Sequence, residues 1–263
     1  VINPATGEKI DTITFATKDE VNQAIEKSKQ AQLEWEKIPQ PTRAEHVKLL
    51  IPLFEQNKDE LAQLYVKEQG KTLAEAQGEI DKSIQFIDYM TSLSMSNKGE
   101  VLQNSVENET IQLTKKPIGV TAGIVPWNAP ILVLLRKVIP AIVTGCSVII
   151  KPSEETTLLT LRLAQLFKAS TIPAGLVQIV PGTGETVGTQ LARHKDIQLI
   201  SLTGSMRAGK SVYEHAAQTV KKVNLELGGN APVIVTPHAD IDKAVDYIVA
   251  ARINNAGQVC TCP

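Results

Sequence analysis

Cysteine, aromatic residues and long apolar runs are all scarce in this chain of 263 residues. Its three cysteines, Cys146, Cys260 and Cys262, are too few for a disulfide framework and fit a reducing compartment, so we expect a cytoplasmic protein. No run of about 18 apolar residues is present, so no membrane span is expected. Because only 4% of the residues are aromatic, aliphatic side chains must fill most of the core.

An excess of charge of either sign is also missing, with 27 Lys and Arg residues against 28 Asp and Glu residues. This balance argues against a nucleic acid or a membrane surface as partner. An anionic cofactor can still bind through backbone N–H groups at helix N-termini. The length and the 43% of hydrophobic residues suit one large α/β domain or two smaller ones. The chain starts at Val1 rather than at Met, which leaves its true N-terminus open.

The first hundred residues are predicted to form helices whose role is packing. Thr17–Glu20, Thr42–Glu45 and Thr72–Glu75 each match the capping box, in which the Thr hydroxyl and the Glu carboxylate accept from free backbone N–H groups. Asn57 is expected to begin a further helix, which Gly70 then ends.

A β-hairpin is predicted next, with strands at Val101–Leu102 and Thr110–Thr114 around a polar turn. The alternation across Ile111 and Leu113 suits a half-exposed ribbon. Since a compact α/β domain has no place for such a ribbon, we expect it to project and contact another subunit.

From Val120 onward, short apolar runs alternate with helical stretches. The runs cover 120–125, 147–150, 177–180, 198–202 and 223–225, and the helical stretches lie near 131–144, 157–168, 185–193 and 206–219. This pattern predicts an α/β fold with a doubly wound, five-stranded parallel sheet, whose ligands bind beyond the carboxyl ends of the strands. A strand at Ala231–Val235 and a helix at Asp240–Arg252 are expected to start a further segment.

The loops after the first two strands carry polar side chains. Asn128, held between two prolines, can donate to a developing oxyanion, although the loop alone favours a turn Asn that bonds its own backbone. After the second strand, Lys151 can meet a phosphate or a ribose and Glu154 can accept from ribose hydroxyls. The alternative for this second loop is a solvated helix N-terminus capped by Ser153.

The glycine-rich loop Gly182–Gly188 follows the third strand. It resembles the dinucleotide fingerprint but has one residue too many before its last glycine, and it does not follow the first strand. We therefore expect a tight turn beside an adenine pocket rather than direct contact with phosphate.

The loop after the fourth strand is the best candidate for a pyrophosphate site. In Thr203–Gly209 a Gly-Ser pair opens a helix and presents free N–H groups and a hydroxyl to an anion. The segment lacks the Gly-Lys-Ser/Thr ending of a P-loop.

A carboxylate and a thiol complete the set of candidates. Glu226 ends the fifth strand, and the two glycines that follow Leu227 leave its side chain room to move. Cys260 lies in a loop-like sequence near the end of the chain. A thiol that attacks a carbonyl and a carboxylate that activates water are the two halves of covalent acyl chemistry. The alternatives are an ordinary strand-end Glu and a buried core thiol.

The neighbouring Cys262 suggests two other chemistries. It can serve as a disulfide partner or a metal ligand, but a zinc site lacks further ligands, so no metal is expected. A thiol redox protein is a weak third hypothesis, because one residue rather than two separates Cys260 from Cys262.

Taken together, these loops resemble the aldehyde dehydrogenase superfamily along nearly the whole chain. The matching motifs, in order, are Asn3–Gly7, Pro126–Asn128, Lys151–Glu154, Thr203–Ser205 with Gly209, Glu226–Gly229 and Gly257–Cys260. One such motif alone would be weak evidence, but six in the right order are specific to this superfamily. The segments around Glu226 and Cys260 look most like the bacterial lactaldehyde/glycolaldehyde dehydrogenase branch.

The resemblance implies a role for each matched residue. Cys260 would form a thiohemiacetal with the aldehyde, Asn128 and the Cys260 N–H would hold the oxyanion, and Glu226 would activate the water that hydrolyses the thioester. The implied cofactor-binding residues are Val125, Pro126, Trp127, Lys151, Ser153, Glu154, Gly184, Gly188, Thr203, Gly204, Ser205, Gly209 and Leu227. Glu154 near the 2′-hydroxyl favours NAD, with NADP as the alternative.

Chains of this family run to about twice the present length, so the resemblance implies a fragment with a half-walled substrate pocket. It divides into helices at 1–100, an oligomerisation hairpin at 101–117, a Rossmann-like NAD-binding core at 118–227 and the start of a catalytic domain at 228–263. In the full-length form we expect a small aldehyde as substrate and a homo-oligomer, dimer or tetramer. The alternative is a catalytically inactive nucleotide-binding or interaction module.

Overall fold

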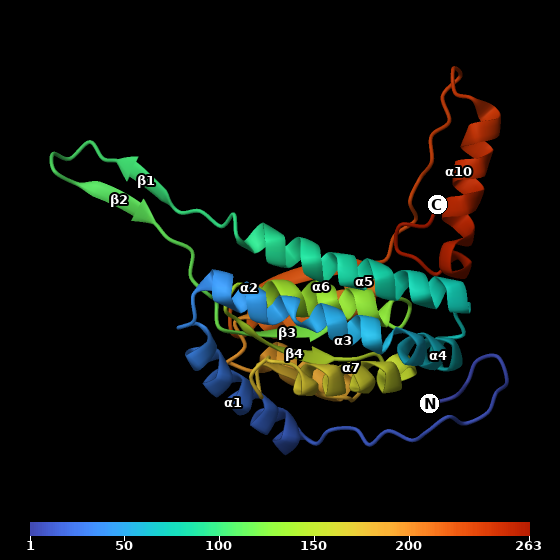
Figure 1. Ribbon diagram of the computed structural model, residues 1–263, viewed down its shortest axis with the longest axis horizontal. Coiled ribbons are helices and arrows are strands. Elements are labelled where there is room, and N and C mark those ends of the chain that lie inside the picture. Colours follow the sequence, from blue (N-terminus) through green and yellow to red (C-terminus); the bar gives the residue numbers. More distant parts are fainter.

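A five-stranded parallel sheet forms the centre of the computed structural model, which describes residues 1–263 (Figure 1). Its strands are β3 (Val120–Ile124), β4 (Ser147–Lys151), β5 (Val177–Ile179), β6 (Leu199–Gly204) and β7 (Lys222–Leu227). The strand order β5-β4-β3-β6-β7 means that the chain grows outward from β3 in both directions. The doubly wound α/β architecture predicted from the alternating runs is confirmed.

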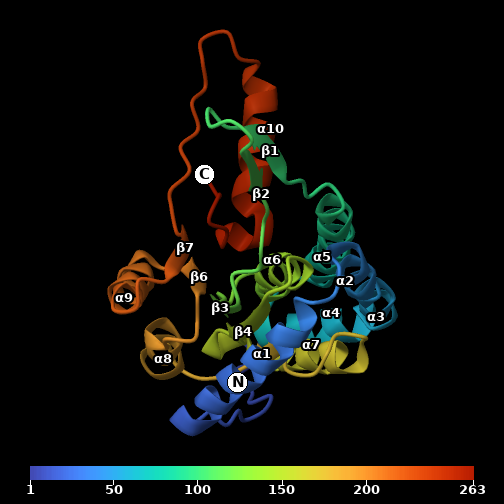
Figure 2. The same cartoon turned by 90° about the vertical axis from the view of Figure 1, so that its left-hand side faces the viewer.

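Helices cover both faces of the sheet, because alternate residues of each strand point to opposite sides. On β4, Val148 and Ile150 join one core cluster, whereas Ile149 joins the other. The first cluster lies beneath α6 (Pro130–Val143) and α7 (Thr157–Ala169), with α2 (Gln40–Lys48), α3 (Leu50–Gln56), α4 (Lys58–Gln69) and α5 (Leu73–Ser94) packed outside them. The second lies beneath α1 (Lys18–Trp35), α8 (Thr189–Arg193) and α9 (Met206–Ala217), as Figure 2 shows.

Most of the predicted helix boundaries are confirmed. Thr17 makes the complete capping box at the start of α1, and the Thr72 hydroxyl accepts from the N–H of Glu75 at the start of α5. Asn57 is the residue that precedes α4, and Gly70 ends that helix at φ 82°. The capping box at Thr42 is wrong, because α2 has a proline in its first turn and already starts at Gln40.

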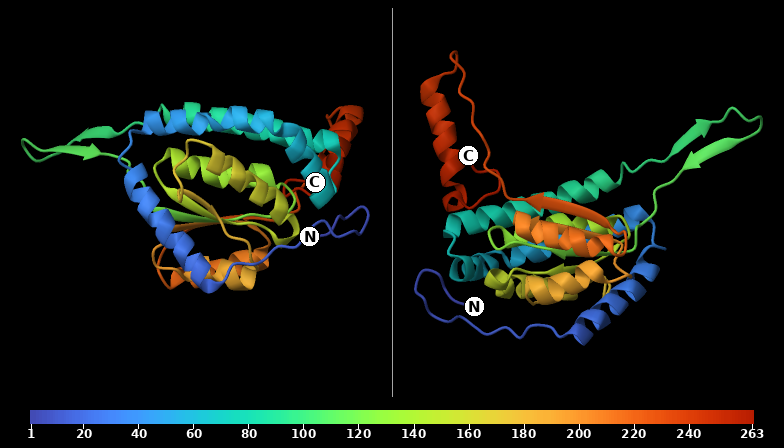
Figure 3. Two further views of the ribbon diagram at one scale, coloured as in Figure 1. Left: turned by 60° about the horizontal axis from the view of Figure 1, so that its bottom comes forward. Right: turned by 180° about the vertical axis from the view of Figure 1, so that it is seen from behind.

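Two arms project from opposite ends of the body (Figures 1 and 3). One is the hairpin of β1 (Glu100–Gln103) and β2 (Thr110–Leu113), whose eight strand residues are all exposed rather than half-buried. The other contains α10 (Ile241–Ile253), which buries no residue. The strand predicted at Ala231–Val235 is wrong, because this segment lies in the second arm, where no neighbouring strand pairs with it.

None of the helices combines the length and the apolar character that crossing a membrane requires.

Candidate active site

The strand ends gather most of the candidate residues at one edge of the sheet. Val125, directly after β3, donates its N–H to the carbonyl of Lys151 at the end of β4, at 3.1 Å. Across the sheet, β6 and β7 run in register so that Thr203 is paired with Glu226, and Gly204 with Leu227. The loops that the sequence singled out therefore open onto a common edge.

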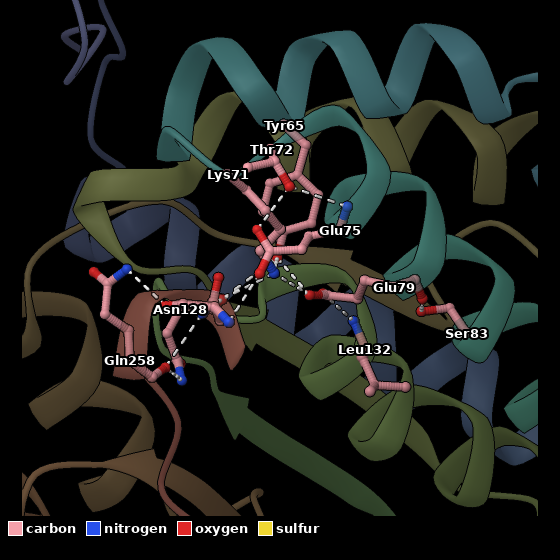
Figure 4. Close-up of polar contacts among 10 residues, drawn as sticks. Tyr65, Lys71, Thr72, Glu75, Glu79, Ser83, Asn128, Leu132 and Gln258 are labelled. Carbon is pink, nitrogen blue, oxygen red and sulfur yellow. Dashed lines mark hydrogen bonds and ion pairs between the residues drawn. The ribbon is translucent and has the colours of Figure 1, made fainter. Parts of the chain in front are cut away.

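The loop after β3 contacts the turn that carries the thiol. The Asn128 side-chain amide donates to the carbonyl of Gln258 at 2.8 Å, and Figure 4 shows these two residues next to each other. Asn255 also donates to this pair, with its side-chain nitrogen 3.1 Å from the Asn128 carbonyl and 3.2 Å from the Gln258 carbonyl. Since Cys260 is only two residues beyond Gln258, the structure brings the predicted amide and the predicted thiol into one neighbourhood.

The three cysteines differ in exposure, and none is in a disulfide. Cys260 is exposed, whereas Cys146 is buried. Cys262 is buried in the same turn as Cys260, with its sulfur 3.3 Å from the carbonyl oxygen and 3.5 Å from a guanidinium nitrogen of Arg252. Cys260 is therefore the thiol that a substrate can reach. No cluster of three or more His, Cys, Asp or Glu side chains is placed to hold a metal ion.

Glu226 is exposed at the end of β7, and its negative charge acts on Lys137 of α6. Burial lowers the pKa of Lys137 to about 8, and the charge of Glu226 opposes this shift. The Lys137 amine donates to the Ser201 hydroxyl at 2.9 Å, and its alkyl chain lies over Gly123, where a Cβ would stand 2.9 Å from it. Lys137 was not among the sequence candidates. The sequence feature that could have pointed to it is that Arg136 and Lys137 are the only charged residues in an otherwise apolar helix.

The loop after β4 folds back on the loop after β5. The Lys151 amine is almost fully buried and contacts the Glu154 carboxylate at 3.0 Å and the Pro152 carbonyl at 2.7 Å. The other oxygen of Glu154 accepts from the N–H of Gly184 at 3.1 Å. Burial lowers the pKa of Lys151, and its bond to Glu154 opposes that shift. Ser153 caps the short helical turn η1 (Glu154–Thr156), as the alternative interpretation of this loop predicted.

The loop after β5 contains a single π-helical turn, η2 (Gly184–Gly188), that leads into α8. The tight turn predicted here is wrong, because a π-helical turn is wider than an α-helical one. Gly188 is buried, and a Cβ on it would lie 3.9 Å from the Lys151 side chain. The turn and the lysine of the neighbouring strand are therefore neighbours, but a Cβ at this distance makes ordinary van der Waals contact, so space alone does not require glycine at position 188.

The N-terminus of α9 faces the same edge. Ser205 caps it, with its hydroxyl accepting from the N–H of Ala208 at 3.2 Å, and no acidic residue occupies the first turn. Gly209 lets the helix lie close to β7, because a Cβ there would be 2.8 Å from Leu227. Val125 is buried beside this edge, Pro126 is partly buried and Trp127 is 41% exposed.

The two best-formed hollows lie elsewhere on the molecule. One, of about 260 Å³, and another, of about 650 Å³, are lined by the N-terminal segment 10–15 and its neighbours. Only Glu154 among the candidates borders either of them. None of Asn128, Glu226 and Cys260 lines either of these hollows.

Comparison with known proteins gives one consistent result. The sequence profile described as "Aldehyde dehydrogenase family" matches residues 1–263. A succinate-semialdehyde dehydrogenase of Escherichia coli, named for NADP(+), and the lactaldehyde dehydrogenase of the same organism are both 38% identical over 262 residues. The matches cover 100% of this chain but 54% and 55% of the two enzymes, so the chain spans about half the length of the curated relatives it matches.

Solved structures agree in fold. A 3,6-anhydro-L-galactose dehydrogenase in complex with NAP has a TM-score of 0.96 at 39% identity, covering 100% of this chain and 55% of that one. A betaine aldehyde dehydrogenase from Staphylococcus aureus in complex with NAD+ has a TM-score of 0.96 at 33% identity, covering 100% and 52%. The matching proteins thus include complexes with either kind of dinucleotide.

Proposed function

The chain belongs to the aldehyde dehydrogenase family, and from that premise we propose that the protein, in a form with the full length of its relatives, oxidises a small aldehyde to a carboxylic acid. The Cys260 sulfur attacks the carbonyl carbon, and the oxygen becomes an oxyanion. Hydride then leaves that carbon, which turns the adduct into a thioester. Water, deprotonated by Glu226, cleaves the thioester and releases the acid and the thiol. A bound NAD would accept this hydride.

The observation that carries this proposal is the bond between the Asn128 amide and the Gln258 carbonyl, two residues before the exposed thiol of Cys260. A side-chain amide has two N–H donors, and only one is used here. The second is available to an oxyanion formed at Cys260. A fixed donor of this kind contributes about 3 kcal/mol to the stability of the transition state.

Glu226 fits the role of general base because it is exposed and close enough to Lys137 for their charges to interact. The backbone after it, Leu227 and two glycines, imposes little restriction on how the carboxylate is placed. Holding thiol, aldehyde and hydride acceptor together supports the reaction, since such positioning accounts for up to roughly 7–11 kcal/mol of a barrier.

The cofactor fits the edge formed by β4 and β6. The N-terminus of α9 offers the Ser205 hydroxyl and backbone N–H groups without a competing acid, which suits a pyrophosphate. In this proposal Lys151 and Glu154 meet the adenosine ribose. Their mutual bond and the bond from the Gly184 N–H to Glu154 support it, because they hold the two side chains together beside this loop. The relatives use NAD or NADP. We propose NAD for this protein, because the Glu154 carboxylate would repel a 2′-phosphate.

Three finer assignments are also proposals. The substrate class is lactaldehyde or glycolaldehyde, although relatives named for lactaldehyde and for succinate semialdehyde are equally similar. The exposed hairpin supports a homo-oligomer. The free thiols support a cytoplasmic location, while two matching plant enzymes are named as mitochondrial.

The test uses the protein in a form with the full length of its relatives. Lactaldehyde, glycolaldehyde and succinate semialdehyde are supplied in turn with NAD or NADP, and the formation of NADH or NADPH is measured. Cys260→Ala is expected to abolish turnover and to leave NAD affinity within about twofold, because the proposal gives the Cys260 sulfur a bond to the aldehyde and none to the nucleotide. Cys262→Ala is the matched control and is expected to stay active. An alanine variant at 260 that kept most of its rate would refute the assignment of the nucleophile.

The second candidate function is an inactive nucleotide-binding or interaction module. It is favoured by the second arm, where α10 buries no residue and Ile234 is 86% exposed, so this arm offers apolar surface to a partner. NAD binding by residues 1–263 without turnover of any of the three aldehydes would support this alternative for the chain by itself.

A further inference from the structure

A buried polar cluster lies directly behind Asn128. The Lys71 amine and the Glu79 carboxylate form an ion pair at 2.6 Å with exposed fractions of 4% and 8%, and the Tyr65 hydroxyl donates to the same carboxylate oxygen at 2.7 Å. Lys71 and Tyr65 also approach the Asn128 carbonyl, at 3.4 Å and 3.5 Å (Figure 4). The other Glu79 oxygen accepts from the N–H of Leu132, in the first turn of α6. The Asn128 loop therefore rests on a cluster that joins α4, α5 and α6.

Asn255 lies between this polar cluster and the turn of residues 255–260, the Cys260 turn. It is buried, with 7% of its surface exposed, and its backbone adopts the left-handed conformation at φ 50°. Its N–H donates to the Glu75 carboxylate at 2.9 Å, and its side-chain nitrogen donates to the carbonyls of Asn128 and Gln258. The Gln258 side chain in turn donates to the Asn255 carbonyl at 3.0 Å. Asn255 thus connects the Asn128 loop, the Cys260 turn and the N-terminus of α5.

We propose that Asn255 is a positioning residue that fixes the Cys260 turn against Asn128, and that Glu75 anchors it from the first turn of α5. The inference deepens the function proposed above and rests on it, because the distance that matters is the one between the Asn128 amide and the Cys260 thiol. Asn255 touches neither substrate nor cofactor in this role and acts through Asn128 and Gln258.

The residue type follows from the contacts. A left-handed backbone favours Gly and Asn, but glycine brings no donor for the two carbonyls. Aspartate has nearly the same shape, yet its carboxylate would face two carbonyl oxygens with no proton to share. Asparagine satisfies the backbone and the donors together. The next residue, Ala256, is also left-handed at φ 55° but makes no side-chain hydrogen bond, which provides a matched control in the same turn.

The first experiment asks whether the side-chain amide holds the turn, and it needs no catalysis. A nitroxide spin label is attached to Cys260 of this chain, with Cys262 replaced by Ser, and its mobility is read from the electron paramagnetic resonance line shape. We expect Asn255→Gly to sharpen the lines, while Ala256→Gly leaves them unchanged although it adds a glycine to the same turn. Glu75→Ala should sharpen the lines, and Glu75→Gln, which keeps an acceptor for the Asn255 N–H, should restore them.

The second experiment asks whether this positioning serves the reaction. In the protein with the full length of its relatives, Asn255→Gly is expected to lower kcat for the aldehyde by about 10- to 100-fold and to leave the KM for NAD unchanged. Because Asn255 serves the reaction by fixing the Cys260 thiol relative to the Asn128 side-chain amide, its effect depends on that amide. The loss in the double variant Asn128→Ala, Asn255→Gly should therefore be close to that of Asn128→Ala alone. Asn255→Asp is the second probe should the glycine variant fold poorly, and it is expected to lose activity to a similar extent.

The outcomes separate the two claims. Equal line shapes for Asn255→Gly and Ala256→Gly would overturn the inference whatever the activity, and so would independent, multiplying losses in the double variant. Turnover that survives Cys260→Ala would instead overturn the proposed function, while the spin-label comparison would still decide whether Asn255 holds the turn.

Discussion

Glu226 and Cys260 show how a sequence singles out candidate residues, and the structure leaves both of them exposed. Both are identified by the chemistry of their side chains and by small or polar neighbours. Lys137 was missed because helical packing explained its surroundings, although it is one of only two charges in that helix. Asn255 was assigned only to a loop, because nothing in one sequence shows that an Asn is left-handed and buried against Glu75, 180 residues earlier in the chain.

Glu226→Gln separates the two chemical steps of the proposed reaction. The amide cannot take a proton from water, so hydrolysis of the thioester should slow by about 100-fold or more, whereas hydride transfer needs no base at this position. Rapid mixing of enzyme, aldehyde and NAD should therefore show a full burst of NADH followed by slow turnover. Loss of the burst itself would assign Glu226 to the first step.

The helices and strands were the level at which the sequence was most informative. Apolar runs located all five strands and their intervening helices, because a parallel sheet buried on both faces leaves a simple pattern. The errors have physical reasons. At Thr42 a proline in the first turn sets the helix start, and at Ala231–Val235 an apolar segment has no partner to pair with. The contact of α5 with the Cys260 turn, through Glu75 and Asn255, could not be predicted, because the two residues lie far apart in the chain.

Glu68 gives the junction of α4 and α7 a pH dependence. Its carboxylate accepts from the N–H groups of Leu158 and Leu159 at 2.6 and 2.8 Å, yet burial raises its pKa to about 7. The folded protein then holds a proton that the unfolded chain releases near pH 4.5. The free energy of unfolding should therefore fall as the pH rises from about 4.5 to 7.

Glu68→Gln removes this titration and should flatten that slope, which urea unfolding at about pH 5, 6 and 7.5 can measure. Asp59→Asn, on the exposed side of the same helix and outside any ion pair, is the control for a simple loss of charge. If the slope of the Glu68 variant matched that of the unaltered protein, the two N–H donors would outweigh burial, and the carboxylate would be ionised throughout the range.

At the scale of the whole molecule, the shape is a body with two arms, and both arms carry apolar residues that the chain itself leaves uncovered. On the hairpin, Leu102 and Ile111 are cross-strand partners with exposed fractions of 43% and 41%. The sequence indicated a projecting ribbon but not that both of its faces would be exposed.

The hairpin's role in assembly is testable without destroying the hairpin. Leu102→Lys combined with Ile111→Glu replaces an apolar cross-strand pair by an ion pair, which keeps the ribbon's register. We expect this double variant of the protein with its relatives' full length to sediment at a lower mass while still binding NAD. The conservative pair Leu102→Val, Ile111→Val should assemble normally, and an unchanged mass in the charged variant would place subunit contacts elsewhere.

The 22-residue helix α5 is about 33 Å long, and its ends serve different purposes. Its first turn holds Asn255 through Glu75, and its last residue, Ser94, lies six positions before the hairpin begins at Glu100. One helix therefore connects the region of the hairpin with the turn that leads to Cys260. In the proposed homo-oligomer, a force that a neighbouring copy exerts on the hairpin would be transmitted along α5 towards Cys260, with only residues 95–99 between the helix and the hairpin.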